Sequence, residues 1–277
     1  MLYIDITNPK NGTSVSFSYT GIFLINKYDD TASANNWVNT GYGQHGVSYI
    51  QTTMNSRTIN FSFMVANPDT YDLYTNMSTL TWLFNPTDGL KTITVTNTWH
   101  KRVIQAYVSS PLTITDRQGG LYFYSVQLTA PYPFYTDEET QSHVFTSAIG
   151  GFTFPVKFDT GKTFGLDAHT ASILNAGDIP APVKIILSGS AMVNPKVTLA
   201  DGSFIGLTKS ISAGEVVTIT TEYGNKNITV NGVDQNRYLT TGSSWIQLPV
   251  GQSVVSVSCD SGDPNIKLYW NNYYQGM

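Results

Sequence analysis

The stretch Arg57-Thr58-Ile59-Asn60-Phe61-Ser62-Phe63 alternates polar and apolar residues with a period of two. Because a strand points successive side chains to opposite faces of its sheet, this alternation predicts a half-buried β-strand. The rest of the chain is rich in residues that suit a pleated surface, with 17 Tyr, 13 Phe and many Thr residues. We therefore expect an all-β protein, mainly antiparallel.

One segment of the first half has a helical pattern instead. Asn67-Pro68-Asp69 offers an N-cap candidate followed by Pro at the first helical position. Apolar residues then recur at helical spacing on one face, at Leu73, Met77, Leu80 and Phe84. Asn85-Pro86 is expected to end this helix, the only one that the sequence predicts.

The stretch before the alternating segment, about residues 30–50, is rich in Gly and Asn. It includes Asn35-Asn36, Gly41, Gly43 and Gly46, and it has too few apolar residues to form a core. Such a composition is typical of a long exposed loop or arm.

A domain boundary is expected near residue 140. Strand patterns run up to Ala130-Pro131-Tyr132-Pro133, where two prolines block ladder hydrogen bonding. The polar stretch Thr136-Asp137-Glu138-Glu139-Thr140 follows. We therefore expect an N-terminal domain over residues 1–140 and a C-terminal domain over residues 141–277.

The second half consists of short strand patterns separated by turn signals such as Asp201-Gly202, Ala213-Gly214 and Asn231-Gly232. This regular spacing is typical of a two-sheet antiparallel sandwich. The strand patterns are Val183–Leu187, Lys196–Leu199, Val216–Thr220, Asn227–Val230, Trp245–Leu248, Val254–Val257 and Ile266–Trp270.

Charge is scarce in this chain. Charged residues make up 12%, about half of the usual fraction of roughly 25%, and the formal net charge is -4. The exterior must therefore be largely Thr, Ser, Asn, Tyr and Gly, which fits either a neutral β-surface or an assembly surface. The 15 Lys and Arg residues form no basic block, which argues against nucleic acid as a partner. We expect neither a signal peptide nor a membrane span, because no run approaches about 18 apolar residues.

No motif of catalysis, cofactor binding or metal binding stands out, so we expect no enzyme and name no site residues. The histidines His45, His100, His143 and His169 have no second ligand at metal spacing. Cys259, the single cysteine, is expected to be a buried, inert thiol. Asp260–Asn265 is either a plain hairpin turn or an incomplete calcium loop.

The order of these features resembles the distal tail (Dit) proteins of siphophages. Three pieces carry the resemblance: the strand–helix order across Arg57–Phe84, the exit Pro131-Tyr132-Pro133-Phe134-Tyr135, and a C-terminal series of turn motifs. That series contains Asn175-Ala176-Gly177-Asp178, Gly189, Asn194-Pro195, Ala213-Gly214-Glu215, Leu248-Pro249-Val250-Gly251, Leu268-Tyr269-Trp270 and Tyr274-Gln275-Gly276. One departure is Gly251-Gln252, where the family often has Gly-Asn.

The resemblance implies a split-barrel-like N-terminal domain with one helix and a galectin-like or jelly-roll C-terminal sandwich. It also implies a homohexameric ring in the virion, at the tail tip, made in the cytoplasm of the bacterial host. The implied partners are the tail tube protein and a tail-associated lysin, fibre or receptor-binding protein.

A carbohydrate-binding module that contacts the host cell wall is the alternative. Sandwiches of this type can stack sugars on exposed aromatic side chains, and the second half offers Trp245, Tyr269, Trp270, Tyr273 and Tyr274. Trp245 and Trp270 lie in strand patterns, which favours the core for these two. Self-association would indicate the ring protein, whereas a monomer with affinity for a cell-wall glycan would indicate the module.

Overall fold

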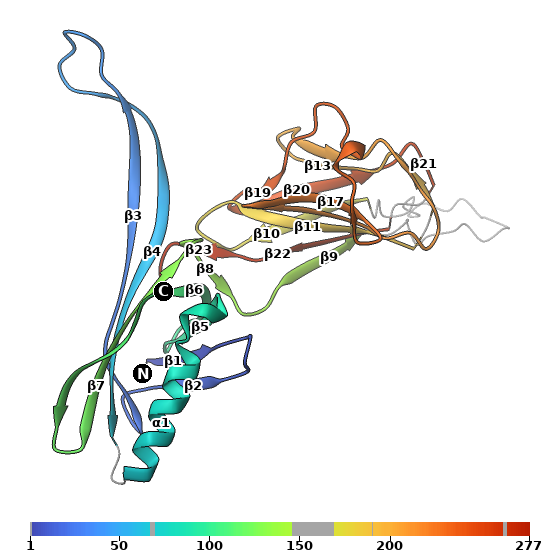
Figure 1. Ribbon diagram of the computed structural model, residues 1–277. Coiled ribbons are helices and arrows are strands. Elements are labelled where there is room, and N and C mark those ends of the chain that lie inside the picture. The colour runs from blue at the N-terminus through green and yellow to red at the C-terminus, as the bar shows by residue number, and fades with distance from the viewer. Residues whose placement is uncertain (1, 67–69, 146–168, 190, 263–264) are drawn as a thin grey trace, which may run out of the picture. The chain divides into compact units, whose positions relative to one another are not determined.

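The computed structural model describes residues 2–66, 70–145, 169–189, 191–262 and 265–277. It divides into two compact units, each with its own core (Figure 1). The first unit comprises Met1–Glu138 together with Gln275–Met277, and the second comprises Glu139–Tyr274. The expected C-terminal domain, residues 141–277, contains these last three residues, whereas the structure groups them with the first unit.

Eight strands, one α-helix and one 3₁₀ turn are found among the described residues of the first unit. They are β1 (Tyr3–Thr7), β2 (Ser14–Phe17), β3 (Phe23–Asn39), β4 (Ser48–Ala66), α1 (Thr70–Leu83), η1 (Pro86–Asp88), β5 (Lys91–Thr96), β6 (Lys101–Gln118), β7 (Leu121–Ala130) and β8 (Tyr135–Asp137).

Its strands form one antiparallel sheet in the order β2-β1-β5-β6-β7-β4-β3, with β8 paired to β6. The predicted alternating stretch lies in β4, where Ile59, Phe61 and Phe63 are fully buried. β4 pairs with β7 only from Arg57 to Ala66. Its earlier residues pair with β3 alone, so these two long strands extend beyond the sheet (Figure 1).

The core of the first unit is a cluster of aromatic rings. The Phe63 ring lies 4.7 Å from Phe17 in an edge arrangement and stacks on Tyr124 at 5.4 Å. It also stacks on Phe84, which follows the helix, with the centroids 6.0 Å apart. Such rings bury large apolar areas, so this cluster ties the helix to the sheet.

The predicted helix is present as α1. On its predicted apolar face Leu80 and Phe84 are buried and Leu73 and Met77 are half-buried. The proposed N-cap Asn67-Pro68-Asp69 lies outside the described residues. The helix ends before Asn85, as expected, and the Asn85 side chain accepts a hydrogen bond from the Thr87 N–H at the start of η1.

The described part of the second unit contains short strands and one 3₁₀ turn. They are β9 (Gln141–Phe145), β10 (Thr170–Asn175), β11 (Ala181–Leu187), β12 (Met192–Val193), β13 (Lys196–Leu199), β14 (Phe204–Gly206), β15 (Ser210–Ile211), β16 (Val217–Glu222), β17 (Asn225–Val230), β18 (Val233–Asp234), η2 (Asn236–Tyr238), β19 (Gln247–Leu248), β20 (Gly251–Ser258), β21 (Ser261–Gly262), β22 (Ile266–Trp270) and β23 (Tyr273–Tyr274).

Most of these strands form two antiparallel sheets. One has the order β18-β17-β16-β11-β22-β9 with β19 on β11, the second has the order β10-β20-β13-β14, and β15-β12-β21 form a small third sheet. Alternate side chains of both main sheets are buried, such as Ile185 and Leu268 from the first and Val197 and Val255 from the second. The predicted, mainly antiparallel all-β fold is confirmed, and α1 is the single α-helix among the described residues.

Two sequence expectations need correction. The Gly/Asn-rich stretch is an exposed arm, as one interpretation had it, but its sides are the strands β3 and β4 rather than loop. Trp245 precedes β19 instead of lying in a strand and is half-buried. Neither segment packs one face regularly against a core. Its apolar residues therefore form no period that would tell a strand from a loop.

Replacing Phe63 by Ala is expected to lower the free energy of unfolding of the first unit by about 3–5 kcal/mol, because it opens a cavity in the ring cluster. Urea unfolding, followed by circular dichroism, measures this loss. The matched control is Tyr19→Ala, since Tyr19 is exposed. Equal stabilities of the two variants would contradict the central place of Phe63 in the core.

Candidate functional site

The most distinctive surface of the first unit is the arm, which we define as residues 33–56. Its two strands are paired from Ala34 opposite Met54 to Asn39 opposite Ser48. The register shifts between Ala32 and Ala34 and again between Trp37 and Val38. Within the described residues no further strand pairs with it. The outer edges of this two-stranded ribbon are therefore unpaired, and its residues are exposed on both faces except for the half-buried Met54.

The side chains of the arm are unusual for a surface exposed to water. Residues 31–56 include no Asp, Glu, Lys or Arg. Large apolar side chains are exposed along the arm: Trp37, Val38, Tyr42, Val47, Tyr49 and Ile50. Charged residues are depleted and aromatic residues enriched where protein surfaces become buried by partners. The arm thus has the composition of an interface.

Hydrogen bonds within the arm shape it but do not give it a core. The Trp37 indole N–H donates to Thr53 Oγ1 at 3.3 Å, and Thr52 Oγ1 donates to Asn36 Oδ1 at 2.7 Å. At the tip, the Gly41 N–H donates to Gln44 Oε1 at 3.1 Å. The arm is thus held by its strand pairing and by polar side-chain contacts rather than by buried apolar side chains.

At the base of the arm lies Arg57, whose side chain is only 3% exposed. Its Nη1 donates to Asp30 Oδ2 on β3 at 2.7 Å, and its Nε donates to the Pro133 carbonyl at 2.7 Å. Its Nη2 donates to the Gln275 carbonyl. The guanidinium also lies 5.1 Å from the centre of the Tyr135 ring, within cation–π distance.

Two tyrosines complete this network. The Tyr135 hydroxyl donates to Asp30 Oδ2 at 2.8 Å and lies 2.8 Å from the Tyr28 hydroxyl. Burial raises the pKa of both hydroxyls well above the ordinary value, and the nearby Asp30 carboxylate adds to the rise. Both therefore remain protonated, neutral hydrogen-bonding groups at physiological pH.

The last residues of the chain are fixed by two arginines of the first unit. Arg57 binds the Gln275 carbonyl, and Arg102 Nη1 donates to the Gly276 carbonyl. The base of the arm is thus joined to β3, to the segment after β7 and to the chain end.

A second apolar surface lies on helix α1. Tyr74 and Trp82 are exposed and eight positions apart, so they share one side of the helix. Asp72 is the only charged residue of this helix. The first unit therefore presents two different exposed surfaces with little charge, the arm and this helix face.

The residues considered for chemistry lie in different elements of the chain. His45 is at the arm tip, His100 follows β5, and His143 packs against Phe145 with the ring centroids 4.7 Å apart. No group of three or more His, Cys, Asp or Glu residues suited to a metal is found among the described residues. Cys259 is half-buried beyond the end of β20, so the prediction of a buried thiol was wrong. No helix in the described part of the chain has the length and apolar character of a membrane span.

The aromatic residues proposed for sugar stacking differ in how deeply they are buried. Trp270 is buried in β22, as expected, and Tyr273 is also buried. Tyr269 and Tyr274 are half-buried, like Trp245.

Replacing Tyr135 by Phe is expected to lower the free energy of unfolding by about 1–3 kcal/mol, because Asp30 loses a buried hydrogen bond. Urea unfolding measures the change. Tyr107→Phe is the control, since Tyr107 is exposed on β6. A Tyr135→Phe variant as stable as Tyr107→Phe would show that the network does not hold the arm base.

The raised tyrosine pKa values predict a stability that depends on alkaline pH. A group whose pKa is higher in the folded than in the unfolded state stabilises the fold fully below its unfolded pKa and loses this effect at higher pH. The free energy of unfolding is therefore expected to fall above about pH 10, the ordinary tyrosine pKa. Tyr135→Phe should make this fall shallower in urea titrations at several pH values; an unchanged slope would contradict the assignment.

Comparison with known proteins agrees with the two-unit division of the chain. Residues 10–130 match the phage tail protein RIFT-related domain, and residues 176–274 match the siphovirus-type tail component, C-terminal domain. No curated protein matches the sequence significantly.

Solved structures share the fold over the whole length. The crystal structure of the Dit protein of phage SPP1, described as a paradigm of the hub adsorption apparatus in phages infecting Gram-positive bacteria, aligns with a TM-score of 0.68 at 16% identity, over 98% of each chain. A chain of the phage P2 baseplate in its activated conformation with calcium aligns with a TM-score of 0.56 at 10% identity, over 100% of each chain. With one tail-protein domain matched in each unit, the chain belongs to the siphophage distal tail (Dit) protein family.

Proposed function

We propose that this protein is the distal tail hub of a siphophage, a ring of six copies that joins the tail tube to the receptor-binding apparatus at the tail tip. The observation that carries the proposal is the arm, an exposed ribbon whose residues 31–56 include no charged side chain. Membership of the distal tail family supports the same role.

A closed ring requires heterologous contacts, in which one surface of each copy meets a different surface of the next. The first unit has two such surfaces, the arm and the helix face with Tyr74 and Trp82. The arm also has unpaired strand edges, which can add to a sheet of another copy by β-augmentation. We therefore expect the contacts that close the ring to be made by the first unit of each copy.

The proposed partners follow from this position in the virion. One side of the ring would bind the tail tube protein, and the other a tail-associated lysin, fibre or receptor-binding protein. The role is structural and involves no chemical turnover. It also accounts for the scarcity of charge, because interface cores are depleted of Lys, Glu and Asp.

The native mass in solution tests the ring. Light scattering behind a sizing column, over a concentration series, is expected to reveal a species of about six chains, and negative-stain images should show rings. A chain that stays monomeric at every concentration, even with the tail tube protein added, would overturn the proposal.

A charge placed on the arm should weaken assembly. In Ile50→Lys a lysine must lose its hydration when the arm is covered, which is expected to weaken association at least tenfold, or about 1.4 kcal/mol. Val233→Lys in the second unit is the matched control, because Val233 is 60% exposed and Ile50 is 62% exposed. Equal association of both variants, measured by light scattering, would remove the arm from the interface.

A further inference from the structure

Residues Gln275–Met277 follow the second unit in the sequence but belong to the first unit. We call these three residues the strap. Two arginines of the first unit hold it: Arg57 Nη2 donates to the Gln275 carbonyl, and Arg102 Nη1 donates to the Gly276 carbonyl. Figure 1 shows this end of the chain beside β6, the strand that carries Arg102. The strap therefore lies at the base of the arm.

Both hydrogen bonds from the arginines end on backbone oxygens of the strap. Gln275 and Met277 are themselves exposed. A carbonyl oxygen is present whatever the side chain is, so these contacts depend on the presence of the strap rather than on its side chains.

The strap shields an ion pair from water. Arg57 Nη1 lies 2.7 Å from Asp30 Oδ2, and the two side chains are 3% and 22% exposed. Without the strap, water would reach the guanidinium from the side on which the Gln275 carbonyl now accepts its hydrogen bond. Charges attract each other less strongly in contact with water, and exposed ion pairs contribute little to stability. The strap thus keeps this pair strong.

The same ion pair closes the base of the arm. It joins β3, which carries Asp30, to Arg57, the residue at which the pairing of β4 with β7 begins. Among the described residues, the two strands pair only with each other beyond this point. The direction in which the arm leaves the packed sheet is therefore fixed at this pair.

The order of these residues in the sequence has a consequence for assembly. Asp30, Arg57 and the arm precede the second unit, whereas the strap follows it. A chain whose second unit is still incomplete therefore has the arm but lacks the strap.

We propose that the strap is a checkpoint for assembly: it closes the base of the arm, so that a chain joins a ring only after its second unit has been made. This inference rests on the proposed ring. Closure of the arm base can nevertheless be measured without a ring, so the two proposals can fail separately.

Hydrogen exchange followed by mass spectrometry tests the closure. In a variant that ends at Tyr274, amides of residues 28–31 and 57–61 are expected to exchange about tenfold faster than in the wild-type protein in the same oligomeric state. Amides of residues 93–95, in β5 of the same unit, should keep their wild-type rates. Equal acceleration at both places would show a general loss of stability and overturn the role of the strap at the arm base.

A second variant is needed because the shortened chain acquires a new terminal carboxylate. Arg102→Met removes one of the two arginine contacts while the strap remains, and it should also speed exchange at the arm base. Lys101→Met is the matched control on the same strand, since the ion pair of Lys101 with Glu138 is exposed to water. Unchanged rates in the chain that ends at Tyr274 would overturn the strap, as would equal rates in the two methionine variants.

Mixed assembly tests the checkpoint itself. A variant that ends at Tyr274, tagged at its N-terminus, is co-produced with the untagged wild-type chain. Its share of the ring fraction is expected to be about a tenth of its share of the total. A tagged Met277→Ala chain is the control and should enter rings in proportion.

Proportional entry of both tagged chains would overturn the checkpoint, even where exchange at the arm base is faster. A wild-type chain that forms no ring would overturn the ring and the checkpoint together. The exchange rates alone would then decide whether the strap closes the arm base.

Discussion

The buried guanidinium of Arg57 is the constraint on which the first unit depends. A buried charge that lacks partners costs several kcal/mol, so its acceptors must remain in place. Those acceptors are Asp30 on β3, the carbonyl of Pro133 after β7 and the carbonyl of Gln275. One side chain therefore joins three segments that lie far apart in the sequence.

The position of Arg57 also marks a change in the role of β3 and β4. From Arg57 onward β4 pairs with β7 and buries Ile59, Phe61 and Phe63, so it belongs to the core. In the arm the same two strands have no charged residue, and no third strand among the described residues pairs with them. The network thus anchors the uncharged arm at the point where it leaves the packed sheet.

Sequence reasoning recovered those parts of the fold in which burial leaves a periodic pattern. The alternation at residues 57–63, the helix and the short strands of the second half are of this kind. The arm strands were missed as strands, because side chains such as Asn35, Asn36 and Thr52 face no core and so show no apolar period. Arg57 was only one polar residue of an alternating pattern, and nothing local showed that its side chain is buried.

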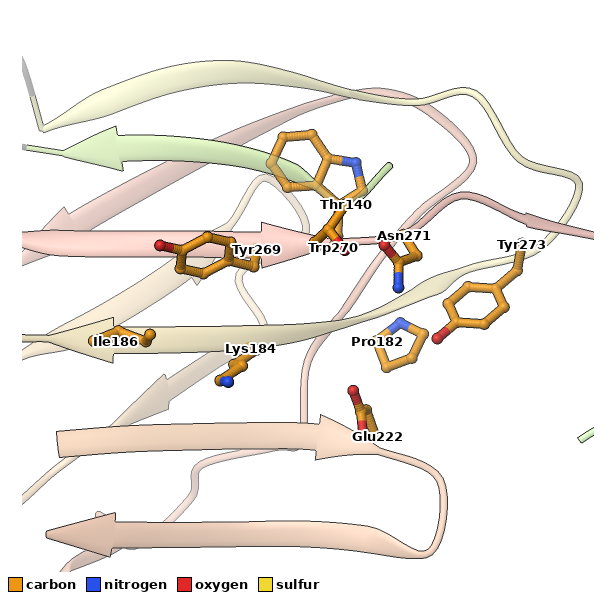
Figure 2. A pocket seen from close by; sticks show the side chains of 9 residues that line it. All are labelled: Thr140, Pro182, Lys184, Ile186, Glu222, Tyr269, Trp270, Asn271 and Tyr273. Carbon is orange, nitrogen blue, oxygen red and sulfur yellow. The ribbon is translucent and has the colours of Figure 1, made fainter. Parts of the chain in front are cut away.

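A hollow of about 440 Å³ on the larger sheet of the second unit (Figure 2) could not be predicted for a different reason. Its lining is brought together by pairing between strands near residues 140, 184, 222 and 270, and no local motif records such pairing. Exposed aromatic rings were therefore the only available signal, yet Trp270 is buried. Strand pairing explains that burial: Trp270 is paired with the buried Val183 and so lies on the core face of the sheet, whereas its neighbour Tyr269 is paired with Lys184 and faces outward.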